Sequence, residues 1–97
     1  MIHVKELVWD DWNVAHIARH DVTPAQVEEV CQAFALVLQG SKGRLVFIAP
    51  TVAGRLLAVI LDPEPDVEEG VYYPVTARPA ARKERRLYQQ HIQGGQP

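Results

Sequence analysis

The sequence lacks the features that mark membrane, secreted and metal-rich proteins. Its 97 residues include one cysteine, Cys31, which can neither form an internal disulfide nor supply a cysteine-rich zinc site. The longest apolar runs, such as residues 56–61, are far shorter than the roughly 20 residues that cross a bilayer. The N-terminus has no apolar segment typical of a signal peptide. These absences predict a cytoplasmic protein that is not bound to a membrane.

Internal repeats and the glycine patterns of nucleotide-binding loops are also missing, so we expect no nucleotide cofactor. What the chain does contain is typical of a folded protein, with 47% apolar and 23% charged residues. The length allows a single hydrophobic core. We therefore predict one domain over residues 1–92, followed by a disordered tail over 93–97 that contains the pair Gly94-Gly95.

The first third of the chain predicts one strand and two helices. A short strand over 2–8 precedes a helix that runs to about His20, and Thr23 followed by Pro24 marks the cap and first residue of the second helix. The apolar residues expected on the buried sides of these helices are Val14, Ile17 and Ala18 in the first and Val27, Val30, Cys31 and Phe34 in the second.

The remainder predicts four strands and a final helix. The strands are expected at Ala35–Leu38, Arg44–Ala49, Arg55–Leu61 and Val71–Ala77. Pro74 has no N–H to donate, which predicts that the last strand lies at an edge or carries a bulge. Pro79 predicts the start of a helix that extends to about Gln90. The predicted fold is α+β, a small antiparallel sheet with two N-terminal helices and one basic C-terminal helix.

Charge is distributed unevenly along the chain. Residues 78–91 hold five cations and one acid, a net +4, whereas the preceding 77 residues hold five cations and eleven acids, a net −6. Guanidinium groups bind phosphate oxygens in pairs, and Tyr88 offers a ring on which a base can stack. RNA or an acidic protein is therefore the expected partner of this helix. Its basic stripe consists of Arg78, Arg82 and either Arg85 or Arg86, which recur every three or four residues.

Two histidines lie four residues apart on the first predicted helix. His16 and His20 can share a metal ion at this spacing, but the sequence offers neither the glutamate of a zinc-protease motif nor an obvious third ligand. We therefore predict no metal and no other cofactor. His20 also ends the helix beside Arg19, where it is placed to meet a phosphate group, and Arg55 opens a predicted strand where it can add a further cation.

Several short motifs, taken together, resemble the BrnT family of bacterial toxins. They are Trp9-Asp10, Arg19-His20-x-Val22-Thr23, Gly54-Arg55-Leu56, Val75-Thr76-Ala77-Arg78 and Glu84-Arg85-Arg86-Leu87-Tyr88. The resemblance spans about residues 7–90 and is most specific in the last motifs. It implies a fold similar to RelE-like ribonucleases and a metal-independent endoribonuclease. It also implies a cognate antitoxin, encoded beside it, of the ribbon-helix-helix class.

In such a reaction the ribose 2′-OH attacks the adjacent phosphate, which requires a base, an acid and cations that stabilise the developing charge. His20 is the candidate for proton transfer, and Arg55 and Arg78 are the candidates for phosphate stabilisation. The chain has Arg19-His20-Asp21 where the family usually has a Lys-His-Gly turn, and Asn13 stands where lysine is common. The candidates for RNA binding are Arg19, Arg82, Arg85, Arg86 and Tyr88.

Two other interpretations stay open. In the first, the chain is a non-catalytic module of the same fold that binds an acidic partner or RNA. In the second, it is an enzyme or metal protein of an unrelated class. We also expect association, with a second copy or with a partner, through the sheet or the basic helix. Residues 44–49 and 55–61 are apolar at successive positions, which places hydrophobic side chains on both faces of the sheet.

Overall fold

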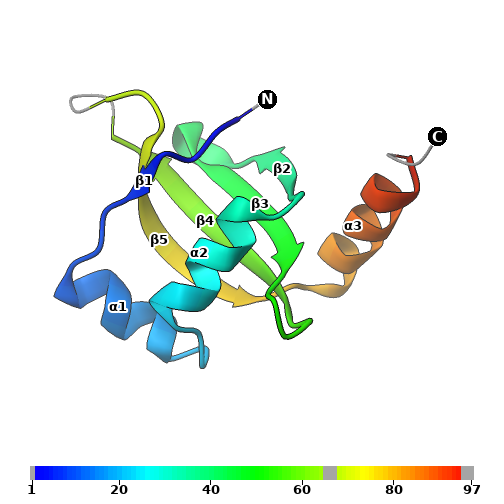
Figure 1. Ribbon diagram of the computed structural model, residues 1–97, viewed down its shortest axis with the longest axis horizontal. Coiled ribbons are helices and arrows are strands. Elements are labelled where there is room, and N and C mark those ends of the chain that lie inside the picture. The colour runs from blue at the N-terminus through cyan, green and yellow to red at the C-terminus, as the bar shows by residue number, and fades with distance from the viewer. Residues whose placement is uncertain (1, 65–67, 95–97) are drawn as a thin grey trace.

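The computed structural model describes residues 2–64 and 68–94. Within them, one five-stranded sheet is combined with three α-helices, which confirms the predicted α+β class (Figure 1). The elements are β1 Glu6–Leu7, α1 Asp11–Ala18, α2 Pro24–Gln32, β2 Leu36–Gln39, the 3-10 turn η1 Ser41–Gly43, β3 Leu45–Pro50, β4 Leu56–Pro63, β5 Val71–Pro79 and α3 Arg82–Gly94.

The sheet has the strand order β1-β5-β4-β3-β2 and is mixed. Strands β2 to β5 pair antiparallel, as their short connections predict, but β1 pairs parallel with β5. The prediction of an antiparallel sheet is therefore wrong at β1. This strand contains only two residues, and its partner lies at the other end of the chain, so no hairpin determines its direction.

Strand β5 carries the irregularity expected from its proline. Ile60 of β4 pairs with Thr76, whereas Leu61 pairs with Pro74, which leaves Val75 without a partner on β4. This two-against-one arrangement is a β-bulge, so the bulge predicted from Pro74 is confirmed. Because β1 pairs only with the first two residues of β5, most of the outer edge of β5 lies beside α1 rather than beside a strand.

Helix α1 is positioned by a buried asparagine. The Asp10 carboxylate accepts from the Asn13 backbone N–H and the Asn13 side-chain oxygen accepts from the Asp10 N–H, both at 2.9 Å. The Asn13 side chain is fully buried, and its Nδ2 donates to the carbonyls of Val8 at 3.0 Å and Pro74 at 3.2 Å. Asn13 therefore ties the first turn of α1 to the segment after β1 and to β5.

This network also corrects the predicted buried side of α1. Ile17 is buried as expected, but Val14 is 38% exposed and Ala18 is exposed, while Asn13 is buried instead. Phe34 was expected on the buried side of α2 and is also exposed. Helix α2 ends at Gln32, so Phe34 lies beyond its helical spacing.

Two apolar layers occupy the two faces of the sheet. Helices α1 and α2 cover one face, while α3 leaves the end of β5 and packs against β2 and β3 (Figure 1). The face toward α1 and α2 contains most of the core, including Leu57, Val59 and Phe47. The face toward α3 buries only Ile48, Ala58 and Ala80.

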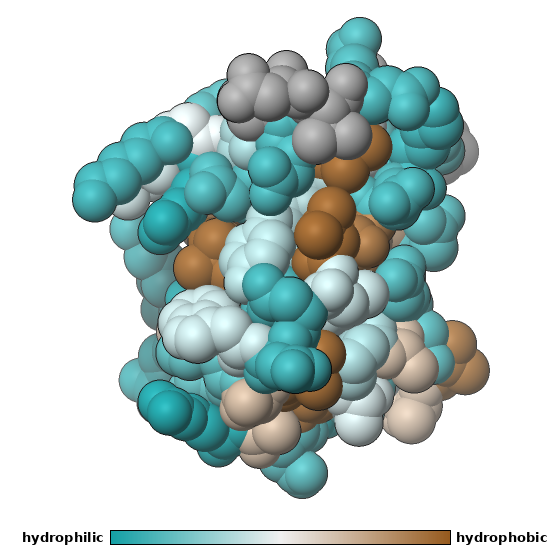
Figure 2. Space-filling view, turned by 90° about the vertical axis from the view of Figure 1, so that its left-hand side faces the viewer, coloured by the Kyte–Doolittle hydropathy of each residue, from teal (hydrophilic) through white to brown (hydrophobic). Residues whose placement is uncertain are grey.

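The side of the molecule formed by β1, β5 and α1 is mainly polar, with apolar residues emerging between polar ones (Figure 2). The predicted tail over 93–97 is only partly described. Gln93 and Gly94 belong to α3, which extends beyond the expected end near Gln90, and residues 95–97 lie outside the described part of the chain.

Candidate nucleic-acid interface

The candidate residues converge on one end of the sheet. Leu57 pairs with Pro79, so β4 begins where β5 ends. Arg55, immediately before β4, therefore lies at the same end as Arg78 and the first turn of α3 (Figure 1). The loop between α1 and α2 also reaches this end, where Arg55 contacts the backbone of His20.

Arg55 joins the β3–β4 turn to the α1–α2 loop. Its Nη2 donates to the His20 carbonyl at 2.9 Å, and its Nη1 donates to the carbonyl of Asp21. Asp21 adopts a left-handed backbone conformation with φ of 58°, which is uncommon for a residue other than glycine. The guanidinium fork thus holds a sharp turn in place, while the His20 side chain beside it stays exposed.

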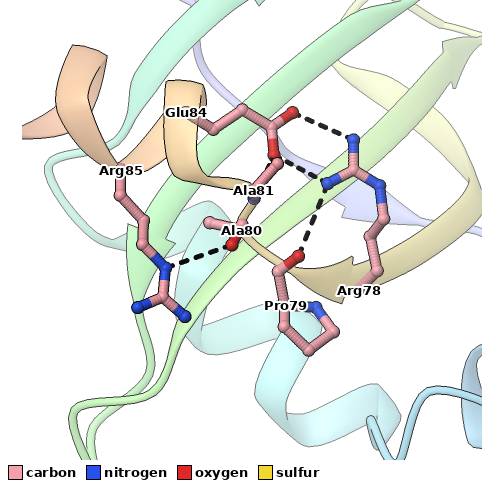
Figure 3. Close-up of polar contacts among 6 residues, drawn as sticks. All are labelled: Arg78, Pro79, Ala80, Ala81, Glu84 and Arg85. Atoms are coloured by element: carbon pink, nitrogen blue, oxygen red, sulfur yellow. Dashed lines mark hydrogen bonds and ion pairs between the residues drawn. The ribbon is translucent and has the colours of Figure 1, made fainter.

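Arg78 lies on the opposite face of the sheet. It pairs with Ala58, and side chains alternate along a strand, so it faces α3, whereas Arg55 faces α1 and α2. Its Nη1 and Nη2 donate to the two carboxylate oxygens of Glu84 at 2.7 and 2.9 Å (Figure 3). The same carboxylate accepts from the Ala81 N–H at 2.7 Å, so Glu84 both pairs with Arg78 and caps the start of α3.

This ion pair changes the titration of both groups. The hydrogen bonds from Arg78 hold the pKa of Glu84 below its ordinary value of 4.5, against an opposing effect of burial, and the Ala81 N–H adds to the lowering. The hydrogen bond to Glu84 in turn raises the pKa of Arg78. Arg78 is therefore a cation whose donors are directed at a carboxylate, the acceptor geometry that a phosphate also offers.

The cations of α3 differ in their surroundings. Arg85 donates from Nε to the Ala80 carbonyl at 3.1 Å (Figure 3). Arg82, Lys83 and Arg86 are exposed, and none forms an ion pair with a described residue. These three side chains are free to meet an external anion.

Tyr88 is half-buried and packs against both apolar layers. Much of its ring is therefore committed to holding α3 on the sheet. Arg19 is exposed at the end of α1, next to His20.

The structure thus brings together only part of the predicted site. His20 and Arg55 are in contact, and Arg78 lies at the same end of the sheet on the other face, with α3. Two further residues have no role in the sequence-based site: Glu84, the partner of Arg78, and Trp12, whose ring stacks on His16. The spacing of four residues between Trp12 and His16 is an available signal, and Glu84 belongs to the last family motif, which does not indicate its partner.

Among residues 2–64 and 68–94, no cluster of three or more histidine, cysteine or carboxylate side chains is arranged to hold a metal ion. The rings of His16 and His20 lie 6.3 Å apart and are inclined by 74°. In the same part of the chain, no helix has the length and apolar character needed to span a bilayer.

No family model, curated protein or solved structure matches the chain. A functional assignment therefore depends on the residues of the chain and their geometry.

Proposed function

We propose that the protein is a metal-independent endoribonuclease toxin of a toxin–antitoxin pair, related to the BrnT family and to RelE-like ribonucleases. The observation that carries this proposal is the convergence of His20, Arg55 and the basic start of α3 at one end of the sheet. Cations attract the phosphates of RNA, and the three exposed cations of α3 supply that attraction from the opposite face of the sheet, at the same end as the exposed His20.

In the proposed reaction the ribose 2′-oxygen bonds to the adjacent phosphorus while the bond from phosphorus to the 5′-oxygen breaks. The 2′-OH loses its proton to a base, and the leaving 5′-oxygen receives one from an acid. His20 carries one of these protons. Arg55 stabilises the charged phosphate at His20. Arg78, on the opposite face of the same end of the sheet, binds a neighbouring phosphate of the strand by exchanging the Glu84 carboxylate for a phosphate oxygen. The products are a 2′,3′-cyclic phosphate and a 5′-OH.

The proposed protein partner is a ribbon-helix-helix antitoxin, and a second copy of the chain is the alternative occupant. On the face toward α3, apolar residues remain half-exposed next to the cations of that helix, a combination that favours a protein partner with acidic side chains. These residues are Leu36, Leu38, Val46 and Leu56.

The test is RNA cleavage by purified protein freed of partner, with and without a chelator. Cleavage should be unaffected by the chelator, should give cyclic phosphate ends, and should not occur on DNA. His20→Ala should lower the rate by about 10² to 10⁴, the usual contribution of a general acid or base. The matched control is His3→Ala, because His3 is an exposed histidine on the N-terminal segment before β1. Wild-type rates in His20→Ala would remove the proton-transfer role.

A non-catalytic binding module is the second candidate, and a specific observation favours it. Arg55, Arg78 and Arg85 all direct guanidinium donors at carbonyl or carboxylate groups of the protein itself. Guanidinium groups bound in this way can hold the fold together without taking part in a reaction. A purified protein that binds RNA or an acidic partner, but neither cleaves RNA nor slows growth, would establish this second function.

A further inference from the structure

Three aromatic side chains form a ladder along the exposed side of α1. The rings of Trp12 and His16 are stacked, with centroids 4.7 Å apart and planes inclined by 8°. His20 follows His16 with its ring edge-on at 6.3 Å. Trp12 and His16 lie four residues apart on α1, so their rings lie above one another along the helix, and His20 continues the row from the turn that follows the helix.

The ladder is not part of the hydrophobic core. Helix α1 buries Asn13 and Ile17 on its other side, whereas Trp12 is 57% exposed. A pair of side chains at this spacing stabilises a helix only slightly, which does not offset the cost of leaving a large apolar ring in water. Exposed tryptophan rings are enriched at binding surfaces, where they combine a wide apolar face with a polar edge.

The ladder leads directly into the candidate interface. Its last member, His20, is held through its carbonyl by Arg55, and the exposed Arg19 lies beside it. At the other end, the carboxylate of Asp10 is occupied by the Asn13 N–H and the Tyr73 hydroxyl. Cations thus lie at the His20 end, and an exposed ring face lies at the Trp12 end.

This arrangement matches the two parts of a nucleotide. Phosphates are attracted to the cationic end, while bases stack on aromatic rings regardless of their identity. Bases inside a duplex already stack on one another and are unavailable, so the ligand must be unpaired.

We propose that the ladder Trp12–His16–His20 is a stacking platform for the unpaired bases of single-stranded RNA, which leads the strand to His20. The inference rests on the proposed function, because it assigns to that site the position of its substrate.

The first experiment uses Trp12 as its own reporter. The chain has two tryptophans, so a Trp9→Phe variant leaves Trp12 as the only indole. The indole removed is the one that donates a hydrogen bond to Glu28. The probe is a single-stranded RNA oligonucleotide with methylated 2′-oxygens, which lacks the nucleophile and is not cleaved. We expect it to quench the Trp12 fluorescence, and the corresponding duplex not to do so. Equal quenching by both would overturn the platform.

The second experiment measures Kd for the same probe by fluorescence anisotropy of a labelled oligonucleotide. Trp12→Ala should weaken binding about 5- to 150-fold, as expected for the loss of one stacked base, and Trp12→Phe should weaken it less. Val14→Ala is the control, because Val14 is an exposed apolar residue of the same helix outside the ladder. Circular dichroism of each variant verifies that α1 is retained.

The outcomes separate the platform from the proposed cleavage. Wild-type affinity in a folded Trp12→Ala variant would refute the platform while RNA cleavage by the unaltered protein still stood. Binding that depends on Trp12 in a protein that cleaves no RNA would support the platform and refute the endoribonuclease. A wild-type protein that neither binds the probe nor cleaves RNA would refute both.

Discussion

The two faces of the sheet are built in different ways. The face toward α1 and α2 is covered by helices that insert fully buried side chains, such as Ile17 and Val27. Helix α3, on the other face, has no fully buried residue and is attached through the half-buried Tyr88, through Arg85 and through the pair of Arg78 with Glu84. Burial of apolar area is the main source of stability. Stability is therefore concentrated on the face toward α1 and α2, while the face toward α3 leaves apolar side chains half-exposed.

The largest expected difference concerns two neighbouring leucines of β4 that point to opposite faces. Leu57 is fully buried beneath α1 and α2, so Leu57→Ala leaves a cavity and should lower the free energy of unfolding by about 3 kcal/mol. Leu56 is half-buried on the face toward α3, so Leu56→Ala should cost about 1 kcal/mol. Urea denaturation measures both values. Equal losses would show that the two faces contribute alike.

A smaller effect is expected at the attachment of α3. Glu84→Gln keeps one oxygen that can accept from the Ala81 N–H but removes the charge that pairs with Arg78, and it should lower the free energy of unfolding by about 1 kcal/mol. Hydrogen exchange should show faster opening of α3 than in the wild type. The exposed Glu6→Gln, in β1, is the matched control.

The pH dependence of this contribution follows from the lowered pKa of Glu84 in the folded protein. The contribution is fully present above the unfolded pKa of about 4.5 and is lost as the pH falls through the folded pKa. The difference in stability between wild type and Glu84→Gln should therefore shrink when denaturation is repeated at acidic pH. A constant difference from pH 7 down to pH 3 would mean that the ion pair does not hold α3.

The last prediction concerns the reactivity of the Cys31 thiol, which lies on the covered face and reports its burial without changing the stability. Burial raises the pKa of Cys31 to about 12, with a further contribution from the charge of Glu28. The thiol should therefore resist aromatic disulfide reagents at pH 8 in the native protein and react once the protein is denatured. The neutral thiol favours the folded state, and this advantage is lost only as the pH rises from about 9 toward 12.

The open face provides the comparison for that measurement. Leu56→Cys in a Cys31→Ala background introduces a thiol on the half-exposed side of β4, where the same reagent should react much faster. Similar protection of the two thiols would contradict the difference between the faces.

Local signals predicted the elements best. Thr23 and Pro24 indicate the start of α2 because the cap is formed within four residues, with the Thr23 hydroxyl accepting from the Gln26 N–H at 3.2 Å. The helical spacing predicts that α2 extends to Phe34, but the helix ends at Gln32. No glycine or proline stands near Gln32 to signal this end. The direction of β1 depends on a partner strand far along the chain, which no local pattern encodes.

The candidate site was predictable as a set of residue types but not as an arrangement. The sequence indicates that cations gather in α3, because their spacing is helical. It does not indicate that Arg55 reaches the carbonyls of His20 and Asp21, since this contact joins the β3–β4 turn to a loop between two helices. Nor does spacing show that Arg78 has Glu84 as its partner, because their contact depends on the turn between β5 and α3.

Val75, the extra residue of the bulge in β5, determines to which face of the sheet each later side chain of that strand points. Counting from Leu61 opposite Pro74, a strand of regular alternation would place Arg78 opposite Leu57. Its side chain would then point to the same surface as Arg55. With Val75 inserted, Arg78 is displaced by one position and points the other way. A single inserted residue thus determines that the two arginines lie on opposite surfaces, so deleting Val75 would move Arg78 to the surface of Arg55 without altering any charge.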